Sequence, residues 1–150
     1  MSSETAMIDL FSDKLKEYSR QVREDRRLES PDASAEKVSR LCGSRITVDV
    51  ALDNADRLTG FGYAVRACAL GEAATAILAA NAVGRSVEEL DQVAEAMRAM
   101  LKEDGPLPGG DWQELEYLRL VRDLKSRHGS VMLPFDALRA ALDDARAKRG

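Results

Sequence analysis

The chain has 150 residues, of which 45% are apolar and 32% are charged, a balance typical of soluble globular domains. Its net charge of −4 gives no reason to expect a nucleic-acid partner, because phosphate binding normally needs a basic surplus on one face. No apolar run of about 18 residues occurs, and the first residues lack the basic start and apolar centre of a signal peptide. We therefore expect a cytoplasmic protein without a membrane partner, folded as one domain over residues 1–150 with its core at about 6–145.

The first predicted element is an amphipathic helix from about Ala6 to Tyr18, where apolar residues recur at helical spacing. Residues 19–34 are polar and charged, which predicts a loop. Its basic residues Arg23, Arg26 and Arg27 are interleaved with acidic ones, so a solvated linker is the favoured interpretation.

A β-hairpin is predicted next. Apolar residues from Ile46 to Leu52 alternate with Arg45, Thr47, Asp49 and Ala51, which gives one buried and one wetter face. Residues 53–56 have turn chemistry, and a second strand runs through Phe61, Tyr63 and Val65 toward Cys68. The segment from Ala35 to Leu41 predicts a third, weaker strand.

The rest of the chain has the pattern of helices. An alanine-rich helix follows Cys68, with Gly84 as its C-cap. Capping boxes are predicted at Ser86 with Glu89 and at Asp111 with Glu114, on either side of a linker loop at 104–111. Pro134 suits the first turn of a last helix. Strands followed by helices predict an α+β fold, a small three-stranded antiparallel sheet covered by about five helices.

Two cysteines are the first candidates for chemistry. Cys42 precedes the clearest strand, and Cys68 lies where the antiparallel neighbour ends and a helix begins, so both are expected at one end of the sheet. In a reducing compartment they are expected to be thiols or metal ligands, since structural disulfides are rare there. A helix N-terminus favours the thiolate form. The alternative is a pair of buried structural cysteines.

The single histidine, His128, is the third candidate. A lone histidine is usually a surface or capping residue, but two thiolates and one imidazole form a known zinc set with one position left over. Glu72 lies one turn after Cys68 and could face the same site. Its simpler interpretation, which we prefer, is a carboxylate that favours the positive end of the helix dipole.

The order of these motifs resembles the IscU/SufU (NifU N-terminal-like) family of iron–sulfur cluster assembly scaffolds. Its first motif is similar to Leu41-Cys42-Gly43-Ser44, its second to Ala67–Ala73, and its third to Arg127–Leu138. The interval between Cys68 and Ser130 (130 − 68 = 62 positions) and Arg127 are similar to the SufU branch. The family holds zinc or a nascent [2Fe–2S] cluster with three cysteines and an aspartate. Here serines, Ser44 and Ser130, occupy two of those four positions.

The resemblance implies a scaffold or carrier rather than an enzyme. It would bind zinc or a nascent cluster through Cys42 and Cys68, with His128 or Glu72 as a further ligand. It would act with a SufS-like cysteine desulfurase and with apo iron–sulfur client proteins. Sulfur acceptance at position 130 is expected to be lost, because serine is a poor ligand and nucleophile beside cysteine. Two alternatives stay open: a metal-free interaction module of the assembly machinery, and a thiol switch between Cys42 and Cys68.

Overall fold

The computed structural model describes residues 3–40 and 43–149, and it confirms the α+β prediction. The elements in chain order are α1 (Ser3–Gln21), β1 (Ala33–Val38), β2 (Arg45–Leu52), β3 (Leu58–Arg66), α2 (Ala69–Asn81), α3 (Val87–Glu103), the 3₁₀ helices η1 (Gly110–Val121) and η2 (Lys125–Arg127), and α4 (His128–Arg149). The first helix extends beyond its predicted bounds at both ends. No helix within the described residues is long and apolar enough to cross a membrane.

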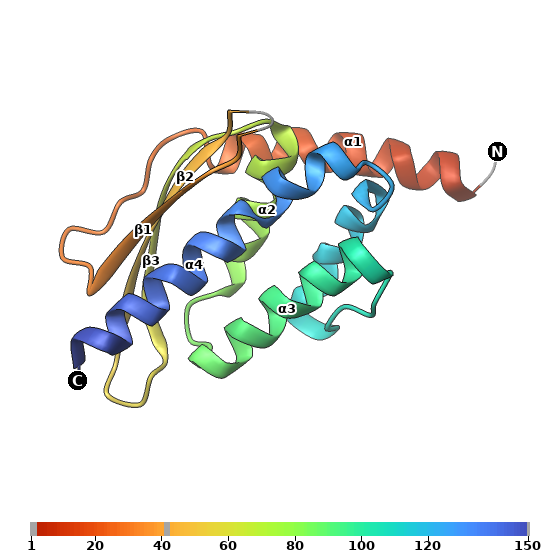
Figure 1. The fold of residues 1–150 in the computed structure, drawn as a ribbon. Coiled ribbons are helices and arrows are strands. Elements are labelled where there is room, and N and C mark those ends of the chain that lie inside the picture. The colour runs from red at the N-terminus through yellow and green to blue at the C-terminus, as the bar shows by residue number, and fades with distance from the viewer. Residues whose placement is uncertain (1–2, 41–42, 150) are drawn as a thin grey trace.

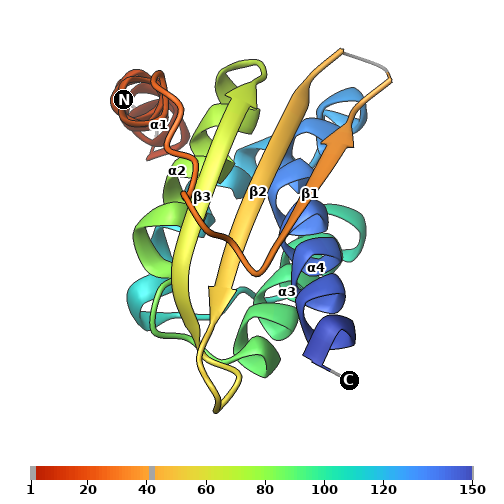
Figure 2. The same cartoon turned by 90° about the vertical axis from the view of Figure 1, so that its left-hand side faces the viewer.

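The sheet is antiparallel with strand order β1–β2–β3, and helices cover one of its faces (Figures 1 and 2). The predicted alternation in β2 is confirmed, since Ile46, Val48 and Val50 are buried. Helix α4 packs against β1 and β2, and α2 packs against β3. The core lies between this face and the helices, where burial of aliphatic side chains is the main stabilising contribution.

The other face of the sheet is crossed by the segment of residues 22–32 that leads from α1 to β1 (Figure 2). The carboxylate of Asp49 on β2 is fully buried beneath it and accepts hydrogen bonds from Arg27 Nε (2.7 Å), Leu28 N (2.9 Å) and Ser34 Oγ. The prediction of a wetter face at Asp49 is therefore wrong. The prediction of a solvated linker is confirmed, since residues 22–32 are mostly exposed and 48% of the Arg27 side chain stays accessible. A buried carboxylate needs such donors, and this segment supplies them.

Gly62 permits this close crossing. It pairs with Asp49 across β2 and β3. A Cβ atom at Gly62 would lie 2.7 Å from both Arg26 O and Leu28 N, closer than such atoms can approach. The backbone of Arg26 in turn exchanges two hydrogen bonds with that of Tyr63, which attaches the segment to the free edge of β3.

The two predicted capping boxes have different outcomes. Ser86 Oγ accepts from Glu89 N (3.1 Å) at the start of α3, as predicted. The second prediction is wrong, because η1 begins after Gly109 without a side-chain cap. Asp111 pairs instead with Arg85, and Glu114 accepts a hydrogen bond from Tyr18. Tertiary partners thus take both side chains away from the helix end.

Two further helix ends differ from expectation. Helix α4 begins at His128, so Pro134 lies inside it rather than in its first turn. Pro134 cannot donate to the carbonyl of Ser130, but the residues before it are buried, and packing holds the turn that the ring weakens. At the end of α2 the C-cap is Ala82, and Gly84 takes a positive φ of 94° two residues later.

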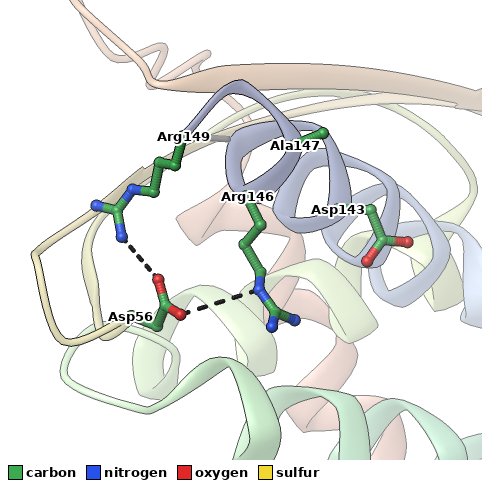
Figure 3. Close-up of a pocket in the computed structure, with 5 residues that line it drawn as sticks. All are labelled: Asp56, Asp143, Arg146, Ala147 and Arg149. Carbon is green, nitrogen blue, oxygen red and sulfur yellow. Dashed lines mark hydrogen bonds and ion pairs between the residues drawn. The ribbon is translucent and has the colours of Figure 1, made fainter.

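The C-terminus of α4 holds the turn between β2 and β3 (Figure 3). Arg149 donates to Asp56 Oδ1 (2.7 Å) and to the backbone oxygens of Leu52 (2.9 Å) and Asp53 (2.6 Å). Asp53 also accepts from the backbone of Ala55 within the turn, as its predicted turn chemistry requires. An open pocket of about 530 Å³ lies beside this contact, at the end of the sheet away from Cys68.

Candidate functional site

Three segments that are distant in the sequence meet at one end of the sheet. Arg45 pairs with Arg66, so the residues before β2 lie opposite those after β3. Ser44 Oγ lies 3.3 Å from Ser130 Oγ in the first turns of α4. In Figure 2 this end is at the top, where β2 begins and β3 leads into α2. The antiparallel register therefore brings the residues that precede β2 and those that follow β3 to one end of the sheet.

Cys68, one of the two cysteines, lies at the start of α2. Cys42 lies outside the described residues. Cys68 is the N-cap residue of α2 in an extended conformation, and its carbonyl accepts the first helical hydrogen bond from Glu72 N (3.0 Å). The thiol is partly exposed and forms no disulfide. It lies where the free N–H groups of the first helical turn favour negative charge.

Gly71 brings the first turn of α2 against α4. A Cβ atom at this position would lie 2.8 Å from Ala67 Cβ and 3.3 Å from Ser130 O. Any larger residue would push the start of α2 away from Ser130. The role of Gly71 was not predicted from the sequence, although a glycine within an alanine-rich helix indicates a close approach of another element.

The serines at the two remaining family ligand positions are buried, with 3% of Ser44 and none of Ser130 exposed. Their hydroxyls are within hydrogen-bond distance of each other. A serine hydroxyl must lose a strongly held proton before it binds a soft metal. The pair is therefore suited to join β2 to α4 rather than to bind a metal.

His128 begins α4 and is 95% buried. Its Nε2 lies 2.7 Å from the carbonyl oxygen of Arg122. A carbonyl only accepts, so Nε2 carries the hydrogen, and in the neutral ring Nδ1 keeps a lone pair. Nδ1 is buried and has no hydrogen-bond partner among the described atoms. In metal-binding histidines one ring nitrogen donates a hydrogen bond to the protein, and the lone pair of the other nitrogen binds the metal. His128 has this arrangement.

Glu72 faces another part of the molecule. Its Oε1 accepts a hydrogen bond from Ser19 Oγ of α1 (2.9 Å), so the carboxylate joins α1 to the first turn of α2. Within residues 3–40 and 43–149, no three side chains of histidine, cysteine, aspartate or glutamate come close enough to hold a metal. The predicted set of Cys42, Cys68 and His128 includes one residue outside those ranges.

Comparison with solved structures identifies the family. The N-terminal part of a nitrogen-fixing NifU-like protein from Brucella abortus superposes with a TM-score of 0.87 and 37% identity, over 95% of this chain and 99% of that one. No family model matches the sequence, and no curated protein does. The chain belongs to the NifU N-terminal-like group of the IscU/SufU family, which confirms the resemblance of its motifs.

Two more distant structures support the fold alone. A candidate iron–sulfur cluster assembly scaffold of the SUF system from Fervidobacterium islandicum has a TM-score of 0.78 at 18% identity, over 86% of this chain and 93% of that one. A hypothetical protein has a TM-score of 0.80 at 21% identity, over 90% and 98% of the respective chains. The arrangement of sheet and helices is thus retained where most side chains differ.

Proposed function

We propose that this protein is an iron–sulfur cluster assembly scaffold or carrier. Its cargo is zinc or a nascent cluster, held by Cys42 and Cys68 with His128 as the third ligand. A cysteine desulfurase is its sulfur-supplying partner, and apo iron–sulfur proteins are its clients. Membership in the NifU-like family is the observation that carries this proposal, together with the scaffold role given for the structural neighbour from F. islandicum.

The position of Cys68 supports a binding role. Its thiol is partly exposed at the N-terminus of α2, where a partner protein can reach it. The dipole of α2 favours the negative charge that thiolate ligands bring to a cluster bound at this end of the helix. A structural cysteine has no need of such a position.

The hydrogen bond of His128 supports its role as third ligand. The carbonyl of Arg122 fixes the tautomer and leaves Nδ1 for a metal. His128 lies two residues before Ser130, so the protein supplies a nitrogen close in sequence to the position where the family has its third cysteine. Two thiolates and one imidazole leave one coordination position for a partner's group or water.

Cobalt titration tests the ligand set, because cobalt replaces zinc and its thiolate bonds absorb strongly in the near ultraviolet. We expect this absorption in the wild type, a loss of about half in Cys68→Ser, and a changed visible spectrum in His128→Gln. Glutamine was chosen at position 128 because its side-chain amide can still donate a hydrogen bond to the carbonyl of Arg122. The variant therefore removes the metal ligand while the fold is kept. Equal spectra for wild type and Cys68→Ser would refute the site.

A second function is favoured by the hydroxyl pair of Ser44 and Ser130. In a metal-free family member these buried serines would join β2 to α4 without cargo, and the conserved shape would serve as an interaction module of the assembly machinery. The double variant Cys42→Ser/Cys68→Ser separates the two functions. An interaction module keeps its affinity for the desulfurase when it loses both thiols, whereas a carrier loses its metal.

A further inference from the structure

A groove of about 260 Å³ lies between the C-terminal part of α1 and the first turn of α2. It is lined by Leu15, Lys16, Ser19, Arg20, Arg23 and Ala69. Lys16, Arg20 and Arg23 recur at the spacing of one helix face, with Arg23 just after the end of α1. The groove thus combines a row of cations with the apolar surface of Leu15 and Ala69.

Within the part of the chain that the structure describes, these three cations lack internal partners. Among the described side chains, no carboxylate forms an ion pair or hydrogen bond with Lys16, Arg20 or Arg23. By contrast, Lys14 on the same helix pairs with Glu17 and Glu114. The whole chain carries a net charge of −4, so a groove with three uncompensated positive charges is a local departure from its surroundings.

The groove lies at the start of α2, the end of the helix that Cys68 caps. Ala69, which lines it, directly follows Cys68. The hydrogen bond from Ser19 to Glu72 (2.9 Å) holds α1 against the same turn of α2. A chain that occupies the groove therefore lies next to Cys68. Two exposed apolar residues, Val38 and Leu124, lie on segments that lead toward this end of the molecule.

We propose that this groove binds an acidic segment of the partner protein that exchanges sulfur or a cluster with Cys68, an inference that rests on the proposed function. Lys16 to Arg23 span roughly 10 Å along the helix direction, the length of about three extended residues. The acidic side chains of the bound segment pair with Lys16, Arg20 and Arg23, and one apolar side chain of the segment contacts Leu15 and Ala69. Such complementary charge accelerates association and sets the orientation of the partner.

The test uses the full chain and a short fluorescein-labelled peptide that alternates glutamate and leucine, with binding followed by anisotropy. We expect Arg20→Glu/Arg23→Glu to weaken binding about tenfold, because two attractive charges become repulsive. The control Arg57→Glu/Lys102→Glu changes the net charge equally at exposed positions outside the groove and should bind like wild type. Added salt should weaken wild-type binding.

Two outcomes would overturn the proposal: a wild-type protein that does not bind the peptide, or equal weakening in the groove and control variants. Metal binding is measured on the same samples. Peptide binding that depends on Arg20 and Arg23 in a protein without metal would support the docking groove while refuting the carrier function. Metal binding without peptide binding would support the carrier function and refute the docking groove.

Discussion

Replacing Gly62 by alanine should destabilise the protein strongly, because Gly62 is where the segment of residues 22–32 touches the sheet. The added Cβ would lie 2.7 Å from Arg26 O and Leu28 N and 2.9 Å from Asp49 Oδ2. The two nearest are backbone atoms, which cannot rotate away. The segment must lift, which strains its packing and breaks the hydrogen bond between Leu28 N and Asp49.

Overpacking costs about 1–3 kcal/mol, and the lost bond to a buried carboxylate adds about 1–2 kcal/mol. We therefore expect Gly62→Ala to lower the free energy of unfolding by about 3 kcal/mol, and the Tm by roughly 6–12 °C for a domain of this size.

Gly60→Ala is the matched control two residues earlier in β3. A Cβ there would meet the end of the Leu28 side chain at 3.2 Å, and that side chain can rotate. We expect a change below about 1 kcal/mol, since the less flexible unfolded chain offsets mild crowding. Denaturant unfolding followed by circular dichroism measures both variants. Equal stabilities of the two would refute the argument that the backbone contact at Gly62 decides the outcome.

Three further predictions concern charge and ligands. Burial raises the pKa of Asp49, but the hydrogen bonds from Arg27, Ser34 and Leu28 N outweigh it and hold this pKa below its usual value. Asp49→Asn should therefore lower the free energy of unfolding by about 2 kcal/mol near neutral pH. Denaturant titrations should show that this difference between wild type and variant shrinks below about pH 4, where the carboxylate becomes protonated. A difference that stays constant with pH would contradict the prediction. Arg149→Ala should lower the free energy of unfolding by about 1 kcal/mol, because this variant loses the contacts of Arg149 to the β2–β3 turn. The control Lys148→Ala keeps those contacts, and equal Tm values for the two variants would contradict the prediction. Ser130→Cys should raise zinc affinity at least about tenfold in chelator competition, whereas Ser126→Cys should not; the reverse order would place the site elsewhere.

The sequence predicted those features that depend on neighbouring residues. The alternation from Ile46 to Leu52 located β2, and Ser86 located the start of α3, because both patterns act within a few residues. The family resemblance likewise rested on short motifs in a fixed order, and the relative from B. abortus confirmed it.

Features that depend on distant residues were not predictable. The strand pattern predicts that Asp49 faces solvent, but in the structure Arg27 and Leu28 cover its carboxylate. The local sequence predicts that Glu114 caps a helix. In the structure it accepts a hydrogen bond from Tyr18, which lies 96 residues away in sequence. Within the site, the contact between Gly71 and the backbone of Ser130 required the arrangement of α2 and α4. Local preference is overruled wherever a tertiary partner offers a stronger interaction.

The metal content of the protein is the decisive measurement for the proposed carrier role. The protein would be purified without a tag under anaerobic conditions and measured by elemental analysis, with Cys42→Ser and Cys68→Ser beside it. We expect about one zinc or about one to two irons per chain in the wild type, and loss of this metal in either variant. A folded wild type without metal, even after incubation with iron, sulfide and a cysteine desulfurase, would contradict it.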